Sequence, residues 1–305
     1  MHLFAAIPKS IIGFVGKTLG MLIYYLDIPH RRIVKRNLKF AFPEWNDKKI
    51  AIIAGRVFQN LGLTILEIIQ LALFSKEDFL RNIRIRGEDH LLNAIEGGKG
   101  IIIISAHLGN WEAASLFSPC YFGYPITVVA RRIESGIINS WILKLRTRFG
   151  NSIIDKEGAL PEMMQTLRSG KILALLIDQG TKKSEGVELA FFGKKVTVTP
   201  AAAMLALRCK SPVIPVFCVR GEDQKLTIII EPPVQLVRTN DLRDDLKTNT
   251  QIMTDVIEKA VRKYPDQWLW LHKRWKRFYP ELYPEYIARR KRRRAKKIKK
   301  MLSEK

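Results

Sequence analysis

The stretch that decides the fold is GIIIISAHLGNWEAA, residues 100–114. Its apolar run, 101–104, is bounded by a glycine and by a Gly-Asn turn, a pattern typical of a buried parallel strand. Asn110 is a good N-cap for a helix that begins immediately after it. The sequence therefore predicts a strand, a short loop that carries His107, and a helix with Glu112 in its first turn.

His107 and Glu112 together have the chemistry of a general base. A helix N-terminus favours negative charge, so Glu112 is expected to be ionised. A carboxylate near an imidazole can fix its tautomer and stabilise its protonated form. We therefore predict that His107 removes a proton and that Glu112 is its partner.

Strand and helix patterns alternate along the chain from residue 83 onward. Strands are expected at 83–86, 101–105, 126–130, 151–154, 172–177, 213–219 and 226–231. Helices are expected at 48–74, 89–96, 111–118, 136–148, 159–169, 199–208 and 242–263. The alternation predicts an α/β fold with a mostly parallel sheet flanked by helices.

The N-terminal segment has the composition of a membrane anchor. Residues 3–26 are mostly apolar and are followed by a basic cluster at 31–39. The segment could span the bilayer with the body on the cytoplasmic side, lie in the interface, or be a buried soluble helix. We predict an N-terminal membrane-anchoring helix within 1–30, one domain over 31–285 and a basic tail over 286–305.

The charge of the chain limits the partners it can have. The 52 Lys and Arg outnumber the 29 Asp and Glu, giving a net charge of +23, of which residues 289–305 contribute +10. Such a basic protein attracts nucleic acid, anionic lipid or an acidic carrier protein. GxSxG, P-loop, HExxH and GxGxxG motifs do not occur, and no Cys/His spacing suits a metal.

Polar residues follow three of the predicted strands. His107 follows IIIISA, Arg131 follows ITVVA, and Asp178 follows ILALLI. In open α/β sheets, ligands bind outside the carboxyl ends of the strands. Since no serine or cysteine nucleophile is evident, we expect a bound hydroxyl to attack an activated acyl group while His107 takes its proton.

These residues carry a resemblance to a known family. HLGNWE at 107–112 resembles the H-x4-D/E motif of glycerolipid-type acyltransferases, and especially their lipid A late (secondary) acyltransferase branch. Five further segments resemble blocks of that branch: RRIVKRNLKFAFPE at 31–44, VVARR at 128–132, RFG at 148–150, LLIDQG at 175–180 and PDQWLWLHKRWK at 265–276. The likeness covers about residues 1–278 and leaves the basic tail outside.

The resemblance implies a glycerolipid acyltransferase-like fold and a specific reaction. A fatty acyl chain would pass from acyl carrier protein to a hydroxyl of a lipid A precursor, at the cytoplasmic face of the inner membrane. His107 would be the base and Glu112 its partner, with no metal or cofactor. Arg131, or the amides of the Gly109-Asn110 turn, could stabilise the developing oxyanion. The implied substrate-binding residues are Arg131, Asp178, Asn110 and Arg148.

Two other readings stay open at this point. The chain could be an acyl-CoA-dependent enzyme acting on a phospholipid or a mannosylated inositol lipid. It could also be a basic membrane-binding or nucleic-acid-binding protein in which the His-Glu pair is structural. No nucleic-acid motif accompanies the basic residues, so we expect no nucleic-acid partner.

Overall fold

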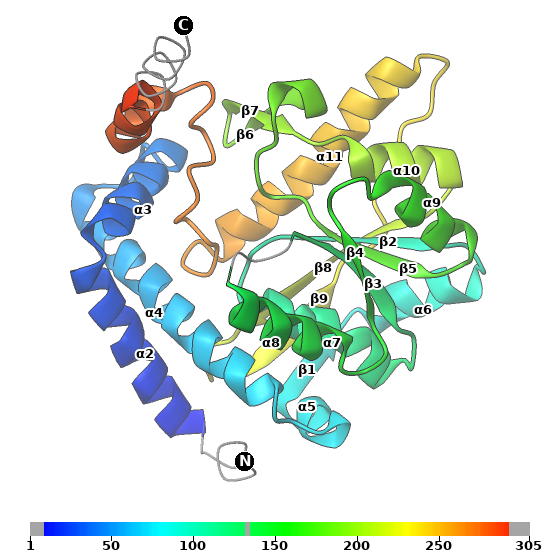
Figure 1. Ribbon diagram of the computed structural model, residues 1–305, viewed down its shortest axis with the longest axis horizontal. Helices are drawn as coiled ribbons and strands as arrows, with labels where there is room; N and C mark the ends of the chain where they lie inside the picture. The colour runs from blue at the N-terminus through cyan, green and yellow to red at the C-terminus, as the bar shows by residue number, and fades with distance from the viewer. Residues whose placement is uncertain (1–8, 132–134, 293–305) are drawn as a thin grey trace, which may run out of the picture.

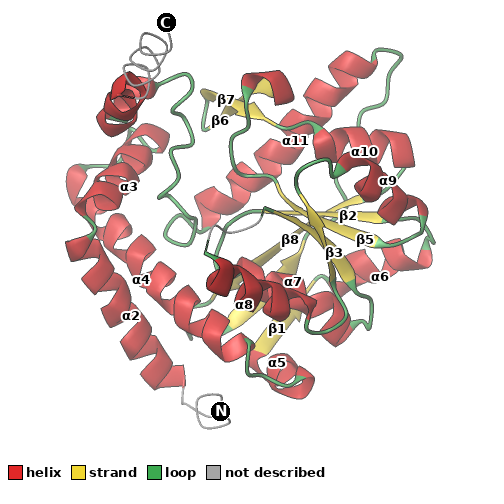
Figure 2. Cartoon of the chain, in the orientation of Figure 1, coloured by secondary structure: helices red, strands yellow, loops and turns green. Residues whose placement is uncertain are grey.

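The computed structural model describes residues 9–131 and 135–292, and a seven-stranded sheet lies at its centre (Figures 1 and 2). The strand order is β1 (Ile83–Arg86), β9 (Leu226–Ile230), β8 (Val213–Arg220), β2 (Ile101–Ser105), β5 (Ile172–Leu176), β3 (Ile126–Ala130) and β4 (Ser152–Asp155). Neighbouring strands are parallel except for the antiparallel pair of β8 and β9. The predicted α/β fold with a mostly parallel sheet is confirmed.

The central strand β2 is apolar along its length because both of its faces are covered. Ile102 and Ile104 belong to one buried cluster, whereas Ile101 and Ile103 belong to another. Successive side chains of a strand point to opposite faces, so an unbroken isoleucine run requires helices on both sides. The first face is covered by α9 (Leu160–Arg168), α10 (Ala201–Cys209) and α11 (Leu242–Lys263). The second is covered by α5 (Lys76–Asn82), α6 (Glu88–Glu96), α7 (Trp111–Tyr121) and α8 (Gly136–Thr147).

Three N-terminal helices form a layer along one flank of the molecule, at the left of Figure 1. They are α2 (Lys9–Leu26), α3 (Ile28–Ala41) and α4 (Asp47–Leu71). The backbones of α2 and α4 meet at glycines: a Cβ on Gly20 would lie 2.1 Å from the Phe58 carbonyl oxygen. The outer side of α2 stays uncovered, since Phe14 and Leu26 are each 73% exposed. The layer therefore presents an apolar surface to its surroundings.

Within the described residues, α4 is the helix that by itself is long and apolar enough to cross a bilayer. Helices α2 and α3 meet that test only as a pair, which is bent by 96°. In this structure α4 lies against the body, because Asn60, Thr64 and Glu67 are hydrogen bonded to groups of the sheet domain.

The predicted elements agree with the structure within a few residues. Helices α3 and α5 were not predicted, and a hairpin was also missed. It consists of β6 (Val187–Phe191) and β7 (Lys194–Val198), which pair with each other and contact α11. Its turn places Phe192 at φ 54° and Gly193 at φ 66°. Phenylalanine rarely adopts positive φ, so the sequence gives no turn signal before the glycine. The tail is helical over 284–292, and residues 293–305 lie outside the described part.

Candidate active site

The strand order brings His107 and Asp178 together. Strands β2 and β5 are parallel neighbours, with Ser105 opposite Leu176, so the residues that follow them meet at one edge of the sheet. The Asp178 carboxylate accepts a hydrogen bond from the His107 backbone amide at 3.0 Å and lies 2.9 Å from His107 Nδ1. Trp268 Nε1 donates to the same carboxylate at 2.8 Å. Three hydrogen bonds thus fix a buried carboxylate behind the imidazole.

Each partner shifts the other's proton affinity. Burial by itself would raise the pKa of Asp178, but the His107 charge and the hydrogen bonds from His107 and Trp268 lower it to about 2. Burial would likewise lower the pKa of His107, but the Asp178 charge and hydrogen bond outweigh it and raise the pKa above 6.5. The pair therefore favours an imidazolium next to an ionised carboxylate.

The hydrogen-bond pattern defines which nitrogen of His107 can act as a base. Asp178 is ionised and can only accept, so Nδ1 is assigned the proton and Nε2 carries the lone pair. The His107 side chain is 20% exposed, and the Gln179 amide lies 3.4 Å from Nε2. The edge of the imidazole is thus open to a substrate while its other nitrogen is anchored.

Glu112 does not hold His107 directly. Its carboxylate receives two hydrogen bonds from Arg146, at 2.6 and 2.8 Å, and a third from Trp111 Nε1 at 3.1 Å. The structure therefore corrects the expected pairing: the hydrogen-bond partner of the imidazole is Asp178. Glu112 still acts on His107 through space, since its charge contributes to the raised pKa.

The amides of the Gly109-Asn110 turn are already used. Gly109 N–H donates to the Gln267 carbonyl and Asn110 N–H donates to the Cys218 carbonyl, both at 2.9 Å. This overturns the expectation that these amides could stabilise an oxyanion. The turn needs a glycine, because Gly109 has φ 59° and a Cβ there would lie 2.0 Å from the Cys218 oxygen.

The four expected substrate-binding residues do not lie together. Asn110 is fully buried and caps α7 through Ala113, and Asp178 is buried behind His107, so both support the site from within. Arg148 lies at the end of α8 and donates to the Leu71 carbonyl at 3.0 Å. Arg131 is exposed and directly follows β3 at the same edge as His107. Substrate contact by Arg131 stays a prediction.

Two residues of the site were missed by sequence reasoning. Arg146 lies two positions before Arg148, and the local pattern cannot choose between two arginines on one helix. Trp268 lies in a tryptophan-rich block about 90 residues after Asp178, and nothing local to either residue links them. Only the folded structure shows that the C-terminal segment packs against the edge of the sheet and so brings Trp268 to Asp178.

A small apolar cavity lies beside the Glu112–Arg146 pair. Its volume is about 50 Å³, and it extends between the sheet and α7. Its walls are mostly aliphatic, with contributions from Ile103, Val128 and Leu176. A polar rim above an apolar interior is the usual design of a site that binds a ligand with one polar end.

Fold and site together define an enzyme of the H-x4-D/E acyltransferase class, with its histidine at the strand edge and its acid on the following helix. The chain belongs to the bacterial lipid A biosynthesis acyltransferase family, whose sequence profile matches residues 1–277. The resemblance seen in the motifs is therefore confirmed, and the protein is an acyltransferase.

Individual relatives agree with this assignment. The chain is 26% identical over 282 residues to a lipid A biosynthesis lauroyltransferase of Escherichia coli, covering 90% of this chain and 89% of the relative. It is 23% identical over 271 residues to a lipid A biosynthesis acyltransferase of Haemophilus influenzae, covering 88% and 83%. A phosphatidylinositol mannoside acyltransferase of Mycolicibacterium smegmatis is 23% identical over 192 residues, covering 61% and 60%.

Proposed function

We propose that this enzyme transfers a fatty acyl chain from acyl carrier protein to a hydroxyl of a lipid A precursor, with His107 as the general base. The observation that carries the proposal is the double hydrogen bond between Asp178 and His107, which anchors Nδ1 and leaves Nε2, 3.4 Å from the Gln179 amide, as the basic nitrogen at the carboxyl edge of the sheet. The names of the lipid A relatives support the acceptor class.

The proposed reaction is direct acyl transfer. His107 Nε2 takes the proton of the acceptor hydroxyl as its oxygen attacks the thioester carbonyl. The new C–O bond forms, the C–S bond breaks, and the imidazolium returns the proton to the leaving thiolate. Asp178 stabilises the imidazolium throughout, and such proton transfer is worth about 10²–10⁴-fold in rate.

The remaining groups of the site have complementary tasks. Exposed Arg131 is a cation available to the oxyanion. The Trp111 and Glu112 amides are further donors, because the first turn of a helix supplies them no backbone acceptor, whereas the Ala113 amide is taken by Asn110. The cavity beside Glu112 and Arg146 has the apolar walls that suit hydrocarbon, and its volume of about 50 Å³ fits a short part of an acyl chain.

Charge and exposure support the proposed partners and location. An acidic carrier protein suits a body that keeps +13 of the +23 without residues 289–305. The exposed apolar side of α2 and the basic cluster at 31–39 suit the surface of an anionic bilayer. We assign membrane attachment to 1–30, catalysis to 31–285 and an accessory role to the tail at 286–305, all on the cytoplasmic side of the inner membrane.

The test offers the enzyme purified acyl carrier protein thioester and, separately, acyl-CoA as donor. Each donor is paired with a lipid A precursor or a mannosylated inositol lipid as acceptor, and the product is identified by mass spectrometry. His107→Ala should abolish transfer, whereas the control His90→Ala on α6 should keep it. Normal transfer by His107→Ala would contradict the mechanism. Transfer only from acyl-CoA to a mannosylated inositol lipid would instead assign the alternative acyltransferase function.

A further inference from the structure

A buried ion pair lies outside the groups that the reaction uses. Arg220, the last residue of β8, donates to both carboxylate oxygens of Glu67 on α4, at 2.6 and 2.9 Å, and also to Asn60 Oδ1 at 2.7 Å. The two charged side chains are only 2% and 12% exposed. Burying two charges is costly, and apolar residues of similar volume often stabilise a fold more. The buried Arg220–Glu67 pair is therefore expected to have a role other than stabilising the fold.

Glu67 has a second partner in the motif that carries His107. Its carboxylate accepts a hydrogen bond from Asn110 Nδ2 at 2.9 Å. This bond fixes the orientation of the Asn110 amide, whose oxygen accepts from Ala113 N–H at 3.0 Å and so caps α7. A carboxylate on α4 thus determines how the loop between β2 and α7 ends and how the helix begins.

A further contact from the same helix reaches the same turn. One helical turn before Glu67, the Thr64 hydroxyl donates to the Gly109 carbonyl at 3.2 Å. Residues 109 and 110 are therefore held from α4 through their polar groups, in addition to the two amide bonds to Gln267 and Cys218. His107 lies two residues before Gly109. The position of the 109–110 turn therefore restricts where the His107 backbone and its imidazole can lie.

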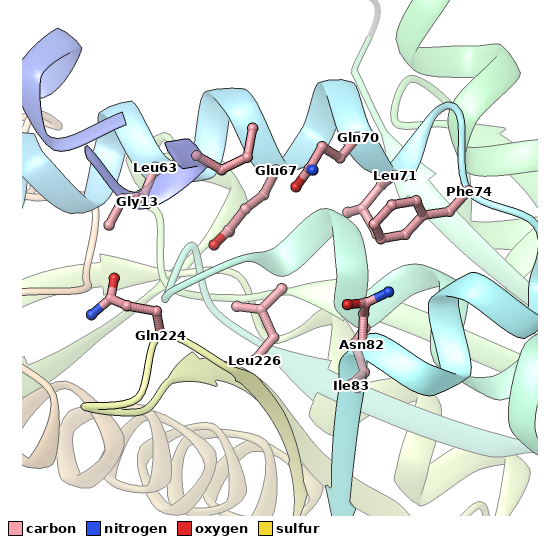
Figure 3. A pocket seen from close by; sticks show the side chains of 11 residues that line it. Gly13, Leu63, Glu67, Gln70, Leu71, Phe74, Asn82, Ile83, Gln224 and Leu226 are labelled. Atoms are coloured by element: carbon pink, nitrogen blue, oxygen red, sulfur yellow. The ribbon is translucent and has the colours of Figure 1, made fainter. Parts of the chain in front are cut away.

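The far side of Glu67 is open. Figure 3 shows its side chain pointing from α4 into a pocket bordered by α2, by α4, by the edge strand β1 and by its neighbour β9. The cavity volume is about 50 Å³, and Gln70 lines it one turn further along the helix. This cavity gives an uncharged side chain at position 67 room to turn away from Arg220 and to release Asn110.

We propose that Glu67 is a positioning residue for the His107–Glu112 loop, and that Arg220 is its buried counterion. The inference rests on the proposed function, since the loop is assumed to carry the base. A displacement of about 1 Å at a catalytic group can cost on the order of 10²-fold in rate. Glu67 therefore acts on turnover through Asn110, without touching substrate.

The first experiment compares Glu67→Gln with wild type in the acyl carrier protein assay, at a temperature where both are folded by circular dichroism. We expect kcat to fall roughly ten- to hundredfold, while KM for the donor changes little. The acidic limb of the pH profile should stay in place, since Asp178 still faces His107. Gln70→Ala is the matched control, because it enlarges the same cavity without touching the turn, and its kcat should equal that of wild type.

A double-mutant cycle separates positioning from a general loss of stability. Asn110→Ser keeps a residue that can cap α7 but removes the bond to Glu67. If Glu67 acts through Asn110, adding Glu67→Gln to Asn110→Ser should change kcat less than twofold. Fully additive losses, or a Glu67→Gln enzyme with wild-type kcat, would overturn the proposal.

Amide hydrogen exchange measures the local stability of the Gly109-Asn110 turn independently of enzyme activity. Glu67→Gln should speed exchange of the Gly109 and Asn110 amides by about tenfold or more, as expected when local opening becomes easier. Unchanged exchange at both amides would contradict the inference even if the wild-type enzyme were inactive on lipid A. An inactive wild type with faster exchange in the variant would refute the proposed function and keep the positioning role of Glu67.

Discussion

The Asp178 carboxylate accepts a hydrogen bond from the His107 backbone amide at 3.0 Å and lies 2.9 Å from the ring Nδ1, although the two residues are 71 positions apart in the chain. One carboxylate thereby fixes the loop that carries the imidazole and the tautomer of the ring. A third bond, from Trp268, keeps that carboxylate from rotating. The base is thus oriented before any substrate arrives, which lowers the entropy cost of the reaction.

Asp178→Asn should lose activity and move the pH profile. His107 must be neutral to act, so kcat/KM falls as pH drops below its pKa, which lies above 6.5 in the folded enzyme. Without the carboxylate the lowering effect of burial remains, so the acidic limb should move to lower pH. We also expect kcat to fall by about 10²–10⁴-fold. The measurement is kcat/KM against pH, with the surface variant Asp223→Asn as control; an unmoved limb would show that Asp178 does not tune the base.

Breaking the Glu112–Arg146 pair should cost stability as well as activity. The side chains are 5% and 15% exposed, and loss of one partner of a buried pair costs about 3–5 kcal/mol. Glu112→Gln should therefore unfold at lower denaturant concentration, and Glu112→Asp should be milder because it keeps the charge. The double variant Glu112→Gln/Arg146→Met should regain much of the stability. If it is no more stable than Glu112→Gln, the two charges do not stabilise each other as the geometry indicates.

Two glycines of α2 should respond in opposite ways to alanine. At Gly20 a Cβ would lie 2.1 Å from the Phe58 carbonyl oxygen, so Gly20→Ala must push α2 away from α4 at a cost of about 1–3 kcal/mol. At Gly13 nothing lies within 4 Å, so Gly13→Ala should be neutral or stabilise the helix by roughly 0.5–1 kcal/mol. Thermal unfolding in one detergent compares the pair. Equal melting temperatures would mean that α2 and α4 do not pack in solution as they do here.

Recognition of the donor by charge should depend on salt. If an acidic carrier protein is attracted by the basic body, KM for the acyl carrier protein thioester should rise with ionic strength. Truncation after Ala288 removes +10 of charge and should weaken membrane retention more than it raises KM. KM is measured at two salt concentrations for both chains in detergent. A salt-independent KM would favour acyl-CoA as the donor, and a large rise on truncation alone would move donor binding to the tail.

Local sequence patterns predicted the strands of the sheet because a strand that is buried on both faces is apolar at successive positions. Ile101 to Ile104 supply both cores in alternation, and no exposed face interrupts the run. The position of His107 at a strand end followed from the same pattern, as did the helix start at Asn110. The hairpin of β6 and β7 escaped detection because its turn uses Phe192, a residue that gives no turn signal.

The sequence by itself thus determined the α/β fold, the strand that precedes His107 and the family to which the chain belongs. Only the tertiary structure decided which acid faces the imidazole. Glu112 is five residues from His107 yet bonds to Arg146, because α7 directs its first turn toward α8. Asp178 reaches His107 because β5 pairs with β2, and strand order is set by packing between distant segments that no local pattern records.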